Sequence, residues 1–119
     1  MSIKTTISIV MITYNHEKYL KEAIEGILKQ ECEFEIELII ANDCSPDNTD
    51  AVVQEVINLN RSGVKINYIK HDKNIGMMHN FLFALNKAKG KYIALCDGDD
   101  YWLDPLKLQK QVRFLEENH

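Results

Sequence analysis

The sequence predicts a three-layer α/β/α fold with a mostly parallel sheet of about four strands. Two observations support this prediction. Apolar, β-branched segments alternate with segments whose apolar residues recur at helical spacing, which is typical of a parallel sheet covered by helices. The chain has 119 residues, of which 45% are hydrophobic and 27% charged, and this suits one domain with a real core. We therefore expect one Rossmann-like unit that spans residues 1–119.

The predicted elements follow one another as strand and helix, four times in a row. The expected strands are Ile7–Thr13, Ile36–Asn42, a strand that contains Ile66, Tyr68 and Ile69, and Lys91–Cys96. The apolar faces of the first two expected helices consist of Tyr19, Leu20, Ala23, Ile24, Ile27 and Leu28, and of Val52, Val53, Val56, Ile57 and Leu59. The third helix is expected over Met77–Ala88, and the buried stripe of the fourth consists of Leu106, Leu108, Val112 and Leu115.

Residues with known preferences mark the ends of these helices. Asn15 is the expected N-cap of the first helix, because its side chain can accept a backbone hydrogen bond. Gly90 is expected to end the third helix in the left-handed conformation. Asp104 and Pro105 are the expected N-cap and first-turn proline of the last helix.

Charge and cysteine content argue against a nucleic-acid-binding protein and a disulfide-bonded secreted protein. The formal net charge is −4 and the fourteen basic residues are scattered, so no nucleic-acid surface is expected. The three cysteines, Cys32, Cys44 and Cys96, form no C-x-x-C pair, and no secretion signal precedes them. We expect reduced thiols and a cytoplasmic protein.

Polar clusters follow all four expected strands. They read "TYN", "NDCS", "HDKNIG" and "CDGDD" in chain order. In open parallel sheets ligands bind beyond the carboxyl ends of the strands. The four loops should therefore converge on one binding edge.

The cluster after the fourth strand contains Asp97, Asp99 and Asp100. Neighbouring carboxylates disfavour one another's ionised form unless a positive charge lies among them, and hard oxygen ligands suit Mg²⁺ or Mn²⁺. An acidic surface loop is the alternative. A helix-loop-helix calcium site is excluded, because its glycine and glutamate positions would fall on Trp102 and Leu108.

Other residues at this edge allow two interpretations each. Asp43 can accept a hydrogen bond from a base or ribose, or it can cap the turn with Ser45. Tyr14 can stack on a flat ring or pack as a half-buried aromatic side chain.

The loop after the third strand is equally open to two interpretations. Asn74, Gly76 and Asn80 suit a tight turn into a helix, with phosphate or ribose contacts as the alternative.

Four stretches in order resemble the family 2 glycosyltransferases with the GT-A fold. They are "ISIVMITYNHEKYLKEAIEGIL", "ELIIANDCSPDNT", "NIGMMHNF" and "GKYIALCDGDDYWLDPLKLQKQ". The resemblance covers essentially the whole chain and implies the nucleotide-sugar-binding part of such an enzyme. Two departures stand out: Ile12 replaces a common proline, and Met78-His79-Asn80 replaces a common Ala-Arg-Asn, so that a phosphate-side arginine has no counterpart.

The resemblance also implies residue roles. Tyr14 would stack near the nucleobase, and Asp43 would hydrogen-bond it, usually as uracil. Asp97 and Asp99 would hold Mn²⁺ or Mg²⁺ against the donor diphosphate. The residues expected to bind the donor are Thr13, Tyr14, Asn15, Asp43, Asn74, Gly76, Asn80, Asp97 and Gly98.

The implied reaction is metal-dependent, inverting transfer of a sugar from a nucleotide-diphosphate donor, such as a UDP-sugar, to a saccharide or lipid-linked acceptor in cell-surface polysaccharide assembly. The general base of the family lies well after the Asp-x-Asp motif, so we expect it beyond His119, the last residue of the chain. We therefore expect no catalytic base within residues 1–119, an acceptor half outside this chain, and no transfer by this chain alone. For the full-length protein, peripheral association with the inner face of the membrane is expected.

Two other classes of protein fit the sequence less well than a glycosyltransferase. A receiver-like, Mg²⁺-binding signalling module also places acidic residues at strand ends, but its acidic pair follows the first strand, where Tyr14 and Asn15 stand here. A nucleotidyltransferase would need a glycine-rich basic loop there, which "TYNHEKYL" does not provide.

Overall fold

The computed structural model describes residues 6–98, 102 and 104–118. Its strands are β1 (Thr6–Thr13), β2 (Glu35–Asn42), β3 (Lys65–Lys70) and β4 (Tyr92–Leu95). Its helices are α1 (Leu20–Leu28), α2 (Thr49–Leu59), α3 (Met77–Leu85) and α4 (Lys107–Asn118). The strands form one parallel sheet in the order β3-β2-β1-β4. The predicted α/β class and the strand-helix alternation are confirmed.

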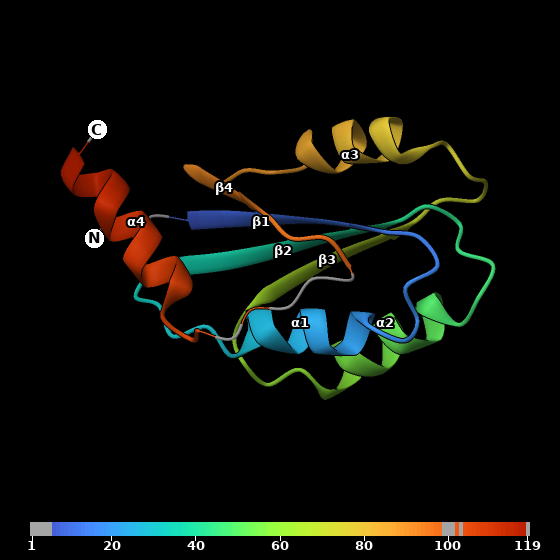
Figure 1. The fold of residues 1–119 in the computed structure, drawn as a ribbon, viewed down its shortest axis with the longest axis horizontal. Coiled ribbons are helices and arrows are strands. Elements are labelled where there is room, and N and C mark those ends of the chain that lie inside the picture. Colours follow the sequence, from blue (N-terminus) through green and yellow to red (C-terminus); the bar gives the residue numbers. More distant parts are fainter. Residues whose placement is uncertain (1–5, 99–101, 103, 119) are drawn as a thin grey trace.

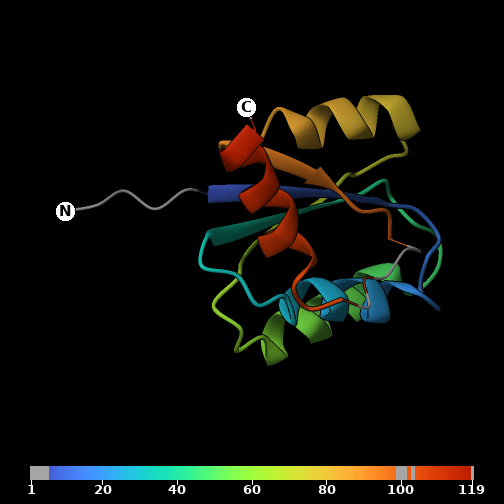
Figure 2. The same cartoon turned by 60° about the vertical axis from the view of Figure 1, so that its left-hand side comes forward.

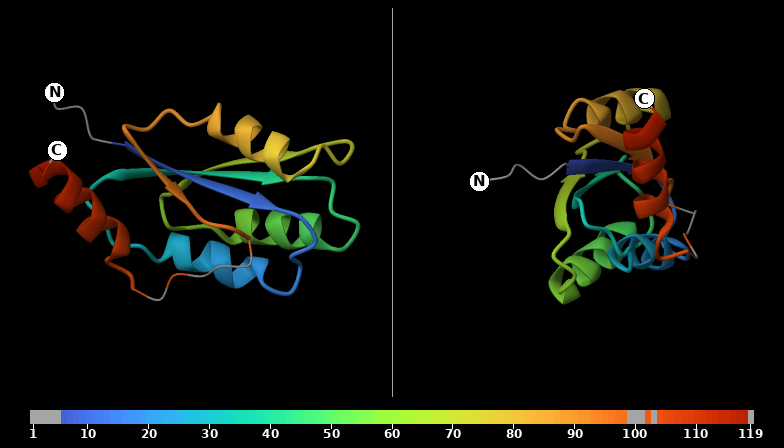
Figure 3. Two further views of the ribbon diagram at one scale, coloured as in Figure 1. Left: turned by 45° about the horizontal axis from the view of Figure 1, so that its top comes forward. Right: turned by 90° about the vertical axis from the view of Figure 1, so that its left-hand side faces the viewer.

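Helices cover both faces of the sheet. Figure 1 shows α1 and α2 below the sheet and α3 above it. Figure 2 and Figure 3 show α4 crossing beside the amino ends of the strands. Leu108 and Val112 of α4 join the main apolar core with side chains of β1, β2 and α1, while Ala84 of α3 packs in a smaller core on the opposite face.

The register brings the carboxyl ends of the strands to one edge. Thr13 at the end of β1 pairs with Asn42 at the end of β2, which in turn pairs with Lys70 at the end of β3. Beyond β4 the chain continues along β1, because the backbone N–H groups of Cys96 and Gly98 donate to the carbonyls of Val10 and Ile12. The loop that contains Asp97 is thus carried to the same edge.

Three predictions about the ends of α1 and α3 are wrong. Helix α1 begins at Leu20 with Tyr19 as its N-cap residue, and Asn15 instead has a positive φ of 63° in the turn before it. Helix α3 ends at Leu85, three residues before the predicted end at Ala88. Gly90 is not left-handed: the described glycines with positive φ are Gly63 and Gly76.

The last helix agrees in part with its prediction. The Asp104 carboxylate accepts a hydrogen bond from the Leu106 backbone N–H at 2.9 Å, as an N-cap does. Leu108 and Val112 are buried, but the predicted Leu106 and Leu115 are exposed in the described structure. None of the helices in the described ranges combines the length and apolarity that a membrane span requires.

Gly90 is needed for close packing of the backbone. A Cβ at this position would lie 2.7 Å from both the Ser8 backbone nitrogen and the Thr6 carbonyl oxygen. Backbone atoms of a central strand cannot move aside cheaply, so Gly90→Ala is expected to lower the free energy of unfolding by ~1–3 kcal/mol. Chemical denaturation measures this, with Lys89→Ala as the neighbouring control, which should change it by less than about 0.5 kcal/mol. Equal stability of the two variants would contradict this packing.

Candidate functional site

A cavity of about 410 Å³ lies at the carboxyl edge of the sheet, on the face that α3 covers. Its lining residues are Ile12, Tyr14, His16, Asp43, Asn74, Gly76, Met77, Asn80 and Asp97. The loops after all four strands and the first turns of α3 contribute to it. Six of the residues predicted to bind a donor are therefore brought together: Tyr14, Asp43, Asn74, Gly76, Asn80 and Asp97.

The remaining residues predicted to bind the donor lie beside the cavity. Thr13 is buried, and its hydroxyl lies 3.0 Å from His16 Nδ1, at hydrogen-bond distance. Gly98 packs against both, since a Cβ there would approach the Thr13 hydroxyl oxygen to 2.6 Å. Asn15 does not line the cavity, although it was predicted to bind the donor. It belongs to the turn that carries Tyr14.

Some of the predictions fall on residues outside the described structure. Asp99, the second predicted metal ligand, and Asp100, which follows it, both lie outside the described residues. The same holds for His119, beyond which the general base is expected. The second metal ligand and the place of the base therefore stay predictions.

Asp43 holds the loop that follows β3. Its two carboxylate oxygens accept hydrogen bonds from the backbone N–H groups of Ile75 at 2.7 Å and Gly76 at 3.0 Å. The Asn74 side-chain amide donates back to the Asp43 carbonyl oxygen at 3.3 Å. Gly76 has a φ of 91°, a value that glycine adopts without strain. These hydrogen bonds between Asp43 and the loop after β3 fix one wall of the cavity.

The alternative prediction that Asp43 caps the turn with Ser45 is wrong, because Asn42 does this instead. The Asn42 Oδ1 atom accepts hydrogen bonds from the Ser45 backbone N–H at 3.1 Å and from the Ser45 hydroxyl at 2.6 Å. Successive side chains of a strand point to opposite faces of the sheet. Asn42 therefore faces the layer of α1 and α2, and Asp43 faces the loop before α3.

The turn after β1 is held by side chains from the segment after β2. Three consecutive backbone N–H groups take part: Asn15 donates to Ser45 Oγ at 3.0 Å, His16 to Thr49 Oγ1 at 3.2 Å, and Glu17 to Asp47 Oδ2 at 3.1 Å. This turn carries Tyr14, whose side chain is 45% exposed at the cavity.

The Asp47 carboxylate is stabilised in its ionised form. Partial burial raises its pKa, but hydrogen bonds from the Thr49 hydroxyl, the Glu17 backbone and the Thr49 backbone outweigh this, so that the pKa lies below its ordinary value. Asp47 therefore holds two segments of the edge, the turn after β1 and the start of α2, most firmly as an anion.

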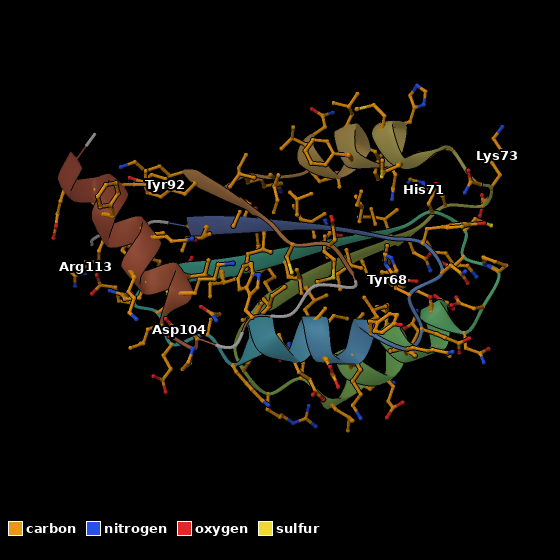
Figure 4. The ribbon with its side chains drawn as sticks, in the orientation of Figure 1. Tyr68, His71, Lys73, Tyr92, Asp104 and Arg113 are labelled. Atoms are coloured by element: carbon orange, nitrogen blue, oxygen red, sulfur yellow. The ribbon has the colours of Figure 1, made fainter. Side chains whose placement is uncertain are left out.

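Asn80 forms the buried floor of the cavity. Its side-chain nitrogen donates to the Ala41 carbonyl oxygen at 2.9 Å, and its Oδ1 lies 2.8 Å from His71 Nε2. Because the amide oxygen can only accept, His71 must carry a proton on Nε2. Figure 4 shows His71 beside the first turns of α3, whereas Lys73 points outward from the loop. His71 is thus a partner of Asn80 and not a solvent-facing side chain.

Among the described residues that line the cavity, Asp97 has the exposed carboxylate that a divalent cation could bind. Asp97 is exposed there, while the Asp43 carboxylate is buried and bonded to backbone N–H groups. Within residues 6–98, 102 and 104–118, no three His, Cys, Asp or Glu side chains cluster as a metal site. Asp97 supplies the hard oxygen that Mg²⁺ and Mn²⁺ prefer, and its predicted partner Asp99 falls outside these residues.

Sequence reasoning missed three of the lining residues, Ile12, His16 and Met77. Ile12 follows from strand alternation, because it shares the face of the sheet on which Val10 packs. His16 stands three residues after Thr13, but this spacing alone does not predict their hydrogen bond. Met77 carries no polar group and gave no signal.

A second, larger cavity of about 560 Å³ lies at the opposite, amino edge. It contains none of the residues that were predicted to bind a ligand, and its lining includes Cys32, Glu35 and Lys65. Ligands of parallel sheets bind at the carboxyl edge, so the smaller cavity is the candidate site.

Comparison with known proteins agrees with the predicted fold. The chain matches the family described as Glycosyl transferase family 2 over residues 8–119. It is 47% identical over 109 residues to an uncharacterized protein of Mycobacterium tuberculosis, which covers 92% of this chain and 31% of that protein. It is 30% identical over 114 residues to the putative teichuronic acid biosynthesis glycosyltransferase TuaG of Bacillus subtilis, covering 96% of this chain and 43% of TuaG. The chain thus spans less than half the length of these relatives.

Solved structures give the same result. Staphylococcus aureus TarS 1-349 in complex with UDP superposes with a TM-score of 0.82 at 29% identity, covering 96% of this chain and 33% of that chain. TarS 1-349 in complex with UDP-GlcNAc also superposes with a TM-score of 0.82 at 29% identity. The predicted GT-A nucleotide-binding fold is confirmed.

The lowered pKa of Asp47 makes its contribution to stability depend on pH. A carboxyl group whose folded-state pKa is depressed stabilises the fold fully above its ordinary pKa of 3.8, and this contribution is lost as the pH falls below that value. Asp47→Asn should therefore lower the free energy of unfolding by ~1 kcal/mol near pH 6, and the difference from wild type should shrink below about pH 3.8.

Denaturation of both proteins over this pH range checks the prediction. Asp72→Asn is the control, because Asp72 is exposed and does not line the cavity. Its difference from wild type should stay near zero throughout, and a difference for Asp47→Asn that does not change with pH would contradict the assignment.

Proposed function

The chain belongs to glycosyl transferase family 2, and we propose that the cavity at its carboxyl edge binds the nucleotide-diphosphate part of a sugar donor. The observation that carries this proposal is the convergence of Tyr14, Asp43 and Asp97 on one cavity of about 410 Å³. Its location beyond the carboxyl ends of the strands is where nucleotides bind in such sheets. TarS, which shares this fold at 29% identity, has been solved with UDP and with UDP-GlcNAc, and this supports a uridine nucleotide.

The base would bind at the Tyr14 side of the cavity. The exposed Tyr14 ring offers a flat face for stacking. Each carboxylate oxygen of Asp43 has capacity for a second hydrogen bond beside the one it accepts from the backbone, so Asp43 can take part in binding a base N–H. Asn74 and Gly76, which Asp43 holds in place, form the adjoining wall.

The diphosphate would bind near Asp97. Asp97 and Asp99 would hold a Mn²⁺ or Mg²⁺ ion, which when bound stabilises the negative charge of the diphosphate leaving group. His16 lines the same cavity and provides a polar ring there. Gly98, packed against Thr13 and His16, keeps the backbone of the Asp97 loop close to the end of β1.

For the full-length protein we propose inverting sugar transfer in the assembly of a cell-surface polysaccharide, at the cytoplasmic face of the membrane. Two relatives support this role. TuaG is described as a putative teichuronic acid biosynthesis glycosyltransferase, and TarS as a poly(ribitol-phosphate) beta-N-acetylglucosaminyltransferase. The acceptor, a saccharide or lipid-linked group, would bind outside residues 1–119, and the general base would lie beyond His119. Sugar transfer to a defined acceptor by this chain alone would contradict that division.

Calorimetric titration with UDP, with Mn²⁺ and with a chelator, tests the donor site. We expect binding that depends on the metal and that weakens by at least about tenfold in Asp97→Asn and Asp99→Asn, since each change removes a charged ligand. Asp72→Asn, which alters an exposed carboxylate away from the cavity, should bind UDP as wild type does. Equal affinity with and without metal, or an unchanged affinity in both cavity variants, would overturn the metal-assisted donor site.

A further inference from the structure

A chain of hydrogen bonds runs from the turn after β1 to α2 through the buried Asn42 and the half-buried Tyr68. The Asn15 backbone N–H donates to Ser45 Oγ at 3.0 Å, and the Ser45 hydroxyl donates to Asn42 Oδ1 at 2.6 Å. The Asn42 side-chain nitrogen then donates to the Tyr68 hydroxyl at 3.0 Å, and this hydroxyl donates to Asp50 Oδ1 at 2.7 Å. The turn after β1 is thus linked to the first turn of α2.

The carboxylate of Asp50 sets the donor-to-acceptor direction of each hydrogen bond in this series. An ionised carboxylate only accepts, so the single proton of the Tyr68 hydroxyl must point toward Asp50. The Tyr68 oxygen is then an acceptor for Asn42, which places the Asn42 amide nitrogen toward Tyr68 and its oxygen toward Ser45. The second hydrogen bond to Asn42 Oδ1, from the Ser45 backbone N–H at 3.1 Å, agrees with this orientation.

In the middle of this series of hydrogen bonds, Asn42 is buried and Tyr68 is half-buried. Asn42 has no exposed surface, and Tyr68 lies between the sheet and the layer of α1 and α2 (Figure 4). Burial raises the pKa of the Tyr68 hydroxyl, with the neighbouring Asp50 acting in the same direction, so the hydroxyl keeps its proton at physiological pH. The Lys70 ammonium lies 3.9 Å from Asp50 Oδ2 and balances the charge of this carboxylate.

None of the residues in this series of hydrogen bonds lines the cavity, but the series ends at Asn15, in the turn that carries Tyr14. Asn15 has a φ of 63°, a left-handed conformation that is uncommon outside glycine but that asparagine adopts more readily than most residues, and its N–H bond to Ser45 supports it here. Asn15 directly follows Tyr14, the exposed aromatic side chain at the cavity. Asn15 and Tyr14 thus belong to the same turn, and a change in the backbone of Asn15 would alter the turn that carries Tyr14.

We infer that Tyr68 and Asn42 are positioning residues, which act through Ser45 to hold the Tyr14–Asn15 turn in the shape that a bound donor meets. Without the Tyr68 hydroxyl, the buried Asn42 amide loses its acceptor and the orientation that serves Ser45. The turn then relaxes, and Tyr14 spends less time in its binding position. The effect on donor affinity rests on the proposed function, whereas the effect on the turn does not.

The test compares Tyr68→Phe with Tyr92→Phe. Both substitutions remove one tyrosine hydroxyl from a strand, but Tyr92 begins β4 at the amino edge of the sheet. Amide hydrogen exchange followed by NMR, without any ligand, reports the turn directly. In Tyr68→Phe, exchange at Asn15 and Ser45 should be at least about fivefold faster, which corresponds to ~1 kcal/mol of lost protection. Exchange at Gly98, whose N–H bonds to β1, should not change, and Tyr92→Phe should leave all three amides as in wild type.

The second readout is the affinity for UDP with Mn²⁺, at a temperature where denaturation curves show every variant to be folded. Tyr68→Phe should bind about fivefold more weakly and Tyr92→Phe as wild type. A merely structural role would lower stability without changing the affinity of the folded protein. Unchanged exchange at Asn15, or faster exchange with unchanged affinity, would overturn the inference. If exchange is faster in Tyr68→Phe but the wild-type chain itself binds no UDP, the role of Tyr68 in the turn would be supported and the uridine donor contradicted.

Discussion

The segment from Asp43 to Thr49 accepts the hydrogen bonds on which the candidate site depends. Because β2 lies between β3 and β1, the loop after β2 has a neighbour on each side. Asp43 accepts from the loop after β3, while Ser45, Asp47 and Thr49 accept from the turn after β1. These loop N–H groups take no part in the backbone hydrogen bonds of the sheet, and the side chains of this segment satisfy them instead. One polar segment thus shapes both walls of the cavity.

The fold follows from the sequence because burial imposes a regular pattern. β1 is covered on both faces, so between its terminal threonines it is apolar except for Ser8. The polar residues that follow each strand mark where the sheet meets solvent. The same logic predicted that Tyr14, Asp43 and Asp97 lie at one edge, and the structure brings them to one cavity. Their roles toward a donor remain predictions, as does a general base beyond His119.

Tertiary contacts decide what the sequence pattern cannot. Asn42 and Asp43 are neighbouring polar residues at a strand end, and their different partners depend on which face each side chain occupies. Asn15 is a good N-cap residue by type, but hydrogen bonds from a segment thirty residues away hold it in a left-handed turn. Gly90 resembles a helix stop, whereas its real constraint is the closeness of Ser8. None of these contacts leaves a local signal.

The most direct test of the account is a map of the backbone amides that UDP perturbs in the NMR spectrum of this chain, with Mg²⁺ as a diamagnetic ion. The account predicts shifts around Thr13–His16, Asp43–Ser45, Asn74–Asn80 and Asp97–Gly98, the loops that surround the cavity at the carboxyl edge. Residues around the amino-edge cavity, such as Cys32 and Lys65, should not respond. Perturbations centred on the amino edge, with the carboxyl-edge loops unchanged, would contradict the central claim that the strand-end loops form a nucleotide site.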